Sequence, residues 1–233
     1  MNKLSVKIPS IISCEKDLKF LENKKSAKIL VVSDSHGAAE ILEKIIKDVG
    51  CDCDAMIFCG DGIYDIISFI KSALEDKKIL ENMPPVIACA RGNGDAENYD
   101  LDIFDENVSE EESIPDQAFF SVNQIVSLKI AGRTVVVTHG HKHNVDFGTD
   151  SLQQTAEVMS ADMVFYGHTH RTKREDAGAT LILNPGSCAR PRGGMPPTFA
   201  VVSFPGITER YDVDFFEITE TLFGGIDFKI CQL

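Results

Sequence analysis

The stretch AKILVVSDSHG (residues 27–37) decides the fold. It is an apolar run that ends in polar residues and a glycine, which is typical of a buried strand leading into a loop. The next residues, AAEILEKIIKDVG (38–50), carry apolar side chains at helical spacing and stop at a glycine. They predict a helix, so the chain opens its ordered part with a strand followed by a helix.

The same pairing recurs downstream. DAMIFCGDG (54–62) predicts a strand that reaches a loop, YDIISFIKSALEDKK (64–78) a helix, and PPVIACARGNGD (84–95) a third strand that reaches a loop. Strands that alternate with helices indicate an α/β domain whose active groups cluster where the strands end.

The pattern changes at Phe119. Two strand-like runs within 119–143 surround Ala131 and Gly132 and predict a hairpin. A helix (150–161), a strand (162–166) and three further strands (179–187, 197–204, 211–218) complete the chain, and we find no internal repeat. The C-terminal third is therefore expected to be mainly β.

Length and charge limit the classes of function. With 233 residues, 43 % of them hydrophobic, the chain can bury a sizeable core. We expect one domain over 28–233, preceded by an N-terminal extension (1–27) that forms a strand or an arm. The net charge of -13 disfavours binding to long nucleic acid, which depends on Lys and Arg neutralising phosphates. A small anionic substrate remains compatible with it, because a local cationic site can outweigh the net charge.

The sequence predicts a cytoplasmic protein. Ile11 to Cys14 resemble the residues before a lipid-modified cysteine, but Lys7 and Pro9 interrupt the apolar run, which is shorter than the roughly 7–15 residues of a signal core. No run approaches the ~20 apolar residues of a membrane span. The seven cysteines are scattered, as reduced thiols are. Cys51 and Cys53 have no second pair at zinc-site spacing, so loop or core positions are expected.

An acidic block follows the third strand. No Lys or Arg occurs between Gly92 and Leu128, while Asp and Glu accumulate there. Like charges repel and little apolar surface is available, so a solvated loop is expected, with an acidic insertion at about 96–118. An alternative is a lid beside the active site that repels polyanions.

Polar donors gather at the strand ends. All six histidines lie in three places, and each place follows a predicted strand: His36; His139, His141 and His143; His168 and His170. Asp34, Asp61 and Asn93 occupy the remaining strand ends. Residues two apart on a strand face the same way, so Asp34 with His36, and His168 with His170, could each address one centre. The glycines beside these donors favour close approach of the backbone to a bound group.

Five ordered motifs resemble one family. Asp34-x-His36, Gly60-Asp61, Gly92-Asn93-x-Asp95, His139-Gly140-His141 and Gly167-His168-x-His170 are similar to those of the calcineurin-like metallophosphoesterases. The run Asn184 to Ser187 is similar to one in their small bacterial and archaeal phosphodiesterase branch. The resemblance covers roughly residues 28–205. It implies a four-layer α/β/β/α sandwich with a dinuclear metal site at the strand ends.

The resemblance also implies the ligands. One metal ion would take Asp34, His36, Asp61 and His170, and the other Asp61, Asn93, His139 and His168, with Asp61 as the bridge. Carboxylate, imidazole and amide donors suit Mn, Fe, Zn or Ni, and the family pattern favours manganese. The implied activity is a metal-dependent phosphodiesterase for small or activated esters, in which a hydroxide held between the two ions attacks phosphorus in line.

Other residues receive supporting roles. We group Asp61, Asn93 and His141 as catalytic, with His141 contacting the phosphate or donating a proton. His143 is expected to point outward. Arg171, Lys173 and Arg174 follow the ligand histidines and are expected mainly to face water, with phosphate contact as the lesser alternative.

Two positions depart from related families. Gly94 stands where many relatives have a histidine that protonates the leaving group; a general acid contributes about 10²–10⁴-fold, so its absence favours esters with good leaving groups. Tyr64, three residues after Asp61, is similar to a tyrosine ligand of purple acid phosphatases, but His36 makes that ligand redundant, so packing or contact with a ligand side chain is expected.

The alternatives to a phosphodiesterase are a non-catalytic metal-binding scaffold, as in a retromer subunit of this fold, or a phosphomonoesterase or nucleotidase. No membrane partner is expected, and a homo-oligomer remains open.

Overall fold

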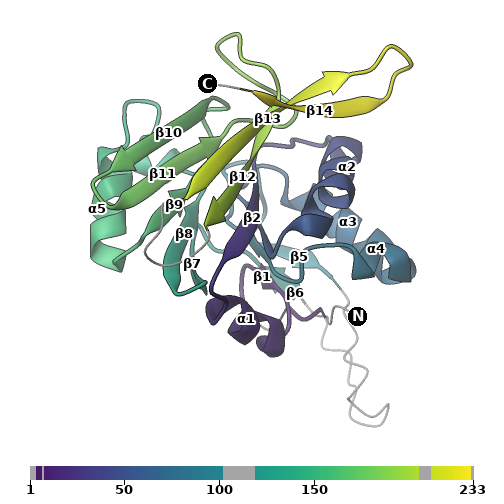
Figure 1. The fold of residues 1–233 in the computed structure, drawn as a ribbon, viewed down its shortest axis with the longest axis horizontal. Helices are drawn as coiled ribbons and strands as arrows, with labels where there is room; N and C mark the ends of the chain where they lie inside the picture. Colours follow the sequence, from purple (N-terminus) through teal and green to yellow (C-terminus); the bar gives the residue numbers. More distant parts are fainter. Residues whose placement is uncertain (1–3, 7, 102–118, 205–210, 232–233) are drawn as a thin grey trace.

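The computed structural model describes residues 4–6, 8–101, 119–204 and 211–231. Two large sheets form its centre (Figure 1). The seven-stranded sheet has the order β1 (Ile11–Ile12), β4 (Ile87–Cys89), β3 (Ala55–Phe58), β2 (Ala27–Val32), β12 (Thr198–Phe204), β13 (Asp212–Glu220), β14 (Ile226–Cys231). The five-stranded sheet has the order β10 (Thr172–Ala177), β11 (Thr180–Pro185), β9 (Met163–Phe165), β8 (Arg133–Thr138), β7 (Ile125–Ile130).

The alternation of side chains on β2 separates two cores. Ile29 and Val31 pack between the two sheets against residues of β8 such as Val135 and Val137. Leu30 and Val32 point the other way, into a core shared with the helices α2 (Ala39–Asp48) and α3 (Ile63–Glu75). Because both faces of β2 are covered, the strand is apolar from Ile29 to Val32, as buried parallel strands are.

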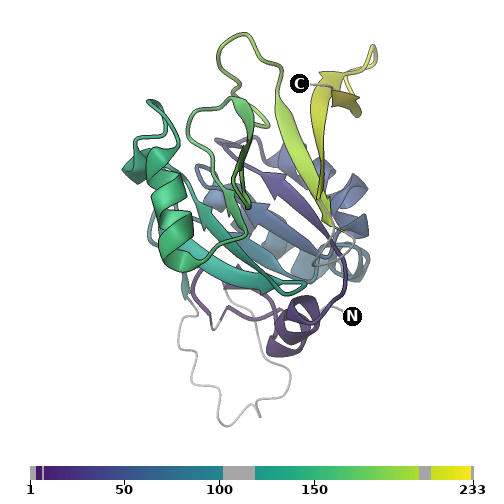
Figure 2. The same cartoon turned by 60° about the vertical axis from the view of Figure 1, so that its left-hand side comes forward.

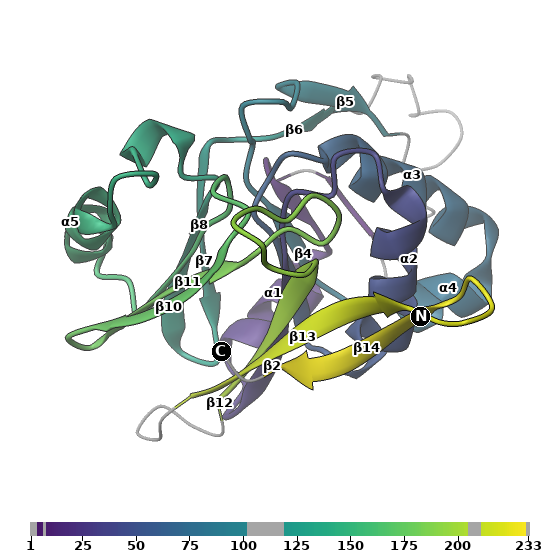
Figure 3. The same ribbon diagram turned by 90° about the horizontal axis from the view of Figure 1, so that it is seen from above.

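The outer face of the smaller sheet is covered by α5 (Asp150–Met159). Leu152 and Ala156 of this helix pack on Val136 and Val164. Seen from above, α5, the five-stranded sheet, the seven-stranded sheet and α2 with α3 follow one another across the molecule (Figure 3). The predicted four-layer α/β/β/α arrangement is therefore confirmed.

Part of the segment predicted as an N-terminal extension packs into this body. β1 pairs antiparallel with β4. The helix α1 (Glu15–Glu22) lies beside the start of β2 and sends Leu21 into the core between the sheets (Figure 2). The carbonyl oxygens of Leu21 and Glu22 accept the backbone N–H groups of Ala131 and Gly132, each at 2.9 Å. The N-terminal segment thus packs at the start of β2 and against the turn between β7 and β8, away from the ends of the strands that carry the polar donors.

The predicted hairpin at Ala131 and Gly132 is confirmed. It joins β7 to β8 with φ of 47° and 77° at the two turn residues, the positive values that suit the twist of a two-residue hairpin. The first predicted run is divided, however. Its start forms β6 (Phe119–Ser121), which pairs with β5 (Asn98–Asp100) in a separate small sheet.

The acidic block differs from the expected loop where it is described. Asn98–Asp100 form a strand, and Leu101 is buried in the core. Residues 102–118, which carry most of the acidic insertion and the suggested lid, lie outside the described residues. Besides β5, the strands β10, whose sequence TKREDA is charged, and β14 were not predicted. β10 and β14 are sheet edges, where charged side chains can face water.

The remaining short elements are α4 (Lys77–Glu81) and the 3₁₀ turns Gly50–Asp52 and His141–His143. No helix in the described part of the chain is long and apolar enough to cross a membrane. All seven cysteines are free; Cys51 is exposed and Cys53 is buried.

The strands β2, β3 and β4 are parallel, as are β8 and β9. The loops that follow the strands of each set therefore lie at one edge of their sheet.

Candidate metal centre

Two buried carboxylates lie at the centre of this edge. Asp34 follows β2 and has no exposed surface, and Asp61 follows β3 and is 5 % exposed. Their loops are bonded to each other: the N–H of Asp34 donates to Gly60 O, and the N–H of His36 donates to Asp61 O, both at 3.0 Å. Backbone hydrogen bonds therefore hold the two acids side by side.

The backbone at the predicted ligands is left-handed. Asp34, His36, Asp61, His168 and His170 have φ between 45° and 68°, a conformation that is uncommon for residues other than glycine and that concentrates at functional sites. The argument from strand periodicity is thus wrong for the Asp34–His36 and His168–His170 pairs. Tight turns beyond the strand ends, and not the pleat of a strand, direct these side chains.

A first group of donors comprises Asp34, His36 and His170. The Nε2 atoms of the two imidazoles are 3.1 Å apart. Oδ1 of Asp34 lies 3.2 Å from Nε2 of His170 and 3.7 Å from Nε2 of His36. Nδ1 of His170 is 2.5 Å from the carbonyl of Arg190, so it carries the proton of the neutral ring, and Nε2 has a free lone pair that can bind a metal.

A second group comprises Asp34, Asp61 and His139. Nε2 of His139 lies 3.5 Å from Oδ2 of Asp61 and 3.9 Å from Oδ1 of Asp34. Nδ1 of His139 donates to Cys59 O at 2.7 Å. Oδ2 of Asp61 is also 3.8 Å from Nε2 of His36, so this carboxylate lies between the two groups.

The donor set fits divalent cations. Oδ1 of Asp34 and Nε2 of His139 are buried and have no hydrogen-bond partner among the described residues. No Lys or Arg in the described ranges forms an ion pair with Asp34 or Asp61. Buried negative charge without a counter-charge is costly. Ligands at about 2.0–2.2 Å from one ion lie ~3–4 Å apart, which is the spacing found here.

The electrostatics point the same way. Burial alone would raise the pKa of Asp61, but the neighbouring ring of His139 and the hydrogen bond from the Gly94 N–H outweigh it and lower that pKa to about 2. Burial would lower the pKa of His139, but the contact with Asp61 and the charge of Asp34 raise it. Burial lowers the pKa of His36, favouring the neutral ring that binds metals. The two acids thus favour positive charge at this position, which is what a bound cation would supply.

Asn93 and His168 lie beside these groups and not within them. Nδ1 of His168 is 3.1 Å from Oδ1 of Asn93, and its Nε2 is 3.1 Å from Oδ2 of Asp146. Both ring nitrogens are therefore occupied, although the His168 ring centroid is only 5.2 Å from that of His139. The sequence analysis gave Asp146 no role, because nothing in its spacing distinguishes it from other loop acids.

The other candidates have mixed outcomes. His141 is partly buried beside His139, with ring centroids 5.5 Å apart, and its buried Nδ1 has no partner among the described residues. The prediction that His143 points outward is wrong: it is 8 % exposed, because left-handed residues at Gly140 and Asn144 turn the short helix inward. Tyr64 is 72 % exposed on α3, so its predicted packing role is wrong.

Residues outside the predicted set hold the loops. The carboxylate of Asp95 accepts backbone N–H groups from Asp61, Gly62, Ile63 and Gly92. Asp65 accepts from the Ser35 hydroxyl at 2.5 Å and from the Gly37 N–H at 2.9 Å. Side chains that accept several hydrogen bonds in this way fix a loop firmly.

The Asn184–Ser187 run forms hydrogen bonds to the loops that carry Asp34 and His168. Nδ2 of Asn184 donates to Gly167 O at 2.7 Å. The Ser187 hydroxyl donates to Asp34 O at 2.7 Å and accepts the N–H groups of Ala189 and Arg190. This run thus ties the loops of Asp34 and His168 to β11.

The glycines of the motifs stand where a side chain would collide with the site. A Cβ on Gly92 would lie 2.1 Å from Oδ1 of Asp61. On Gly167 it would lie 2.0 Å from the Ser33 hydroxyl and 2.7 Å from Oδ2 of Asp34. These glycines were predicted to permit close approach to a bound group; the groups that they approach in the structure are side chains of the protein itself.

Comparison with known proteins agrees with this geometry. The family model described as "Calcineurin-like phosphoesterase superfamily domain" matches residues 27–205. The chain is 28 % identical over 178 residues to a probable metallophosphoesterase, YsnB, of Bacillus subtilis, covering 75 % of this chain and 83 % of that one. It is 28 % identical over 170 residues to the phosphodiesterase MJ0936 of Methanocaldococcus jannaschii, covering 72 % and 89 %.

A solved structure shares the fold at low identity. Vacuolar Protein Sorting 29 from Cryptosporidium parvum aligns with a TM-score of 0.61 at 15 % identity, covering 89 % of this chain and 98 % of that one. At this identity the likeness concerns the arrangement of the chain alone.

Proposed function

Because the chain belongs to the calcineurin-like phosphoesterase superfamily, we propose that it is a metal-dependent phosphodiesterase that hydrolyses small or activated phosphate esters. The observation that carries the proposal is the pair of buried acids, Asp34 and Asp61, whose oxygens face three imidazoles within 3.2–3.9 Å. Such a set of carboxylates and imidazoles serves hydrolysis through two bound metals.

Each of two divalent ions would have four ligands. The first would be held by Asp34, His36, Asp61 and His170, and the second by Asp61, Asn93, His139 and His168. The position of Asp61 between His36 and His139 supports its role as the bridge. To bind the ion, Asn93 and His168 would give up their contact with each other. His168 would also give up its contact with Asp146. Manganese is our first choice of metal, with nickel, zinc and iron compatible with the same donors.

The metals supply positive charge for the phosphate oxygens and lower the pKa of an attacking water. The protein supplies position: Asp61 is fixed by the Gly94 N–H on Oδ1, which leaves Oδ2 for the centre. Burial and the neighbouring rings of His139 and His168 lower the pKa of His141. The neutral ring is thus favoured, and it could donate one N–H hydrogen bond to a phosphate oxygen or to a leaving-group oxygen.

Gly94 sets the preference among esters. No side chain at this position can protonate a leaving group, so a substrate with an acidic leaving group is favoured. This favours activated diesters over simple monoesters. The net charge of -13 further favours small substrates over long nucleic acids, and the seven free thiols are compatible with a cytoplasmic location.

The test removes bound metal with a chelator, restores Mn²⁺, and follows bis(p-nitrophenyl) phosphate beside p-nitrophenyl phosphate. We expect turnover only after metal is restored, with the diester preferred. The variant Tyr64→Phe is the matched control, because Tyr64 is exposed and outside the centre. Preference for the monoester would indicate a phosphomonoesterase, and two bound metals without turnover of either ester would indicate a scaffold.

A further inference from the structure

A cavity of about 450 Å³ lies directly behind the loop that carries His168 and His170. Its walls include Asp146, Tyr166, Thr169, Arg171, Lys173 and Arg192. Two contacts join it to the candidate centre: Asp146 touches Nε2 of His168 at 3.1 Å, and the Arg192 N–H donates to His170 O at 3.1 Å. A substrate held at the centre could therefore extend into this cavity, whose volume suits a small ligand.

The cavity is cationic in a strongly acidic protein. Arg171 and Arg192 form no ion pair with any carboxylate in the described part of the chain, whereas the Lys173 ammonium lies 2.9 Å from Glu175. Asp146, the one acid on the wall, contacts His168. Two guanidinium groups thus remain to meet a negatively charged ligand, while the chain as a whole carries -13.

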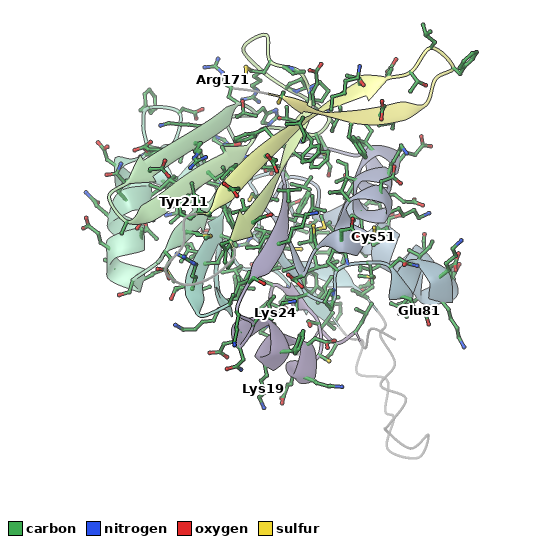
Figure 4. All side chains as sticks on the ribbon, in the orientation of Figure 1. Lys19, Lys24, Cys51, Glu81, Arg171 and Tyr211 are labelled. Carbon is green, nitrogen blue, oxygen red and sulfur yellow. The ribbon has the colours of Figure 1, made fainter. Side chains whose placement is uncertain are left out.

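The Arg171 side chain, which lines the cavity, packs against a neighbouring loop. The Arg171 guanidinium lies over the backbone of Gly193, where a Cβ would come within 2.9 Å of Nε. Figure 4 marks Arg171 at the edge of the molecule, directly before β10.

We propose that this cavity binds a second phosphate group of the substrate, at a site distinct from the phosphodiester that is cleaved. The inference rests on the proposed function and narrows it to diesters that carry an additional terminal phosphate. Arg171 and Arg192 would hold the phosphate by paired N–H···O bonds, a geometry that the planar guanidinium group favours.

Arg174 provides an internal control. It lies two residues beyond Thr172 on the same strand, but its guanidinium is 3.5 Å from Asp176 and lies over the Tyr211 ring. It does not line the cavity. Replacing it removes one positive charge from the same strand without touching the proposed phosphate site.

The kinetic test compares the p-nitrophenyl ester of thymidine 5′-phosphate with and without a 3′-phosphate, using the Mn²⁺-restored full chain. We expect about 10-fold lower KM for the ester with the 3′-phosphate, the effect of about one charge-assisted bond. Arg171→Gln and Arg192→Gln should each reduce this ratio, and Arg171→Lys should retain part of it. Arg174→Gln should leave the ratio unchanged. Equal KM values for the two esters in the wild type would overturn the proposal.

A binding measurement separates this inference from the proposed function. Calorimetry on the Mn²⁺-restored full chain compares thymidine 3′,5′-bisphosphate, thymidine 5′-phosphate and inorganic phosphate. Tighter binding of the bisphosphate, lost in the Arg171→Gln, Arg192→Gln double variant, supports the cavity even if no ester is turned over, in which case the proposed function alone is overturned. Turnover without this preference overturns the cavity and leaves the phosphodiesterase intact. Inorganic phosphate binding as tightly as the bisphosphate would make free phosphate the ligand and overturn the substrate assignment.

Discussion

The backbone N–H of Asp61 donates to Oδ2 of Asp95 at 2.7 Å, across a separation of 34 residues. The other oxygen of the same carboxylate accepts the N–H groups of Gly62 and Ile63 at 2.9 and 3.0 Å, at the start of α3. An anionic side chain at a helix N-terminus satisfies free N–H groups and interacts favourably with the helix dipole. Asp95 therefore fixes the Asp61 carboxylate by fixing the turn that carries it.

Replacing Asp95 with alanine should destabilise the protein more than an ordinary surface change. Four backbone donors, including the Gly92 N–H, would lose their acceptor, so we expect a loss of at least about 3 kcal/mol in the free energy of unfolding. Urea unfolding measures it. The matched control is Glu97→Gln, two residues away, which breaks an ion pair with Arg91 whose acid is exposed; that loss should not exceed about 1 kcal/mol. Equal effects of the two substitutions would contradict the role given to Asp95.

Gly94→His tests whether a missing proton donor limits the substrate range. A Cβ at this position would come within 3.2 Å of Oδ1 of Asp61, so that carboxylate must shift by a few tenths of an ångström. Gly94→Ala should therefore lose some activity toward every ester by moving Asp61. Relative to Gly94→Ala, the histidine variant should hydrolyse alkyl phosphodiesters faster, by up to the 10²-fold or more that a general acid contributes. The measurement is kcat/KM for aryl and alkyl diesters in both variants, and an unchanged aryl-to-alkyl ratio would argue against the explanation.

The cysteines should differ sharply in reactivity. Burial raises the pKa of Cys53 to about 12, and burial also raises the pKa values of Cys59, Cys89 and Cys188. A raised pKa leaves the reactive thiolate scarce at pH 8, about 10⁻⁴ of the population at a pKa of 12. Iodoacetamide at pH 8 should therefore modify the exposed Cys51 first, as peptide mass spectrometry would show. Cys51→Ser is the control, and prompt labelling of Cys53 in the folded protein would contradict its buried position.

Local patterns predicted the strands, the helices and an α/β domain, whereas the four layers were implied by the family resemblance. Each buried strand is an apolar run ended by polar residues, and each helix has its own periodicity, so the strand ends and their donors could be placed before any coordinates. The edge strands β10 and β14 were missed because a strand that faces water on one side needs no apolar run. The small β5–β6 sheet was missed because its strands are distant in sequence and three residues long.

Within the site, residue types were more predictable than their orientation. His170, Asp34 and Asp61 were placed at the correct edge, but their left-handed backbone is set by contacts between loops that no local pattern records. The same limit explains why Asp95 and Asp146 received no role and why His143 was expected to face solvent. Their positions depend on tertiary contacts, since each meets groups delivered by other loops or turns.

The central claim, a pair of divalent ions bridged by Asp61, is tested most directly by metal content. Chelator-treated protein is reloaded with Mn²⁺, freed of excess metal, and analysed by elemental mass spectrometry beside Asp61→Asn prepared identically. We expect about two ions per wild-type chain and fewer than one in the variant, because an amide cannot supply the anionic bridge between two cations. Two ions per chain in Asp61→Asn, or none in the wild type with Mn²⁺, Zn²⁺, Fe²⁺ or Ni²⁺, would contradict the account.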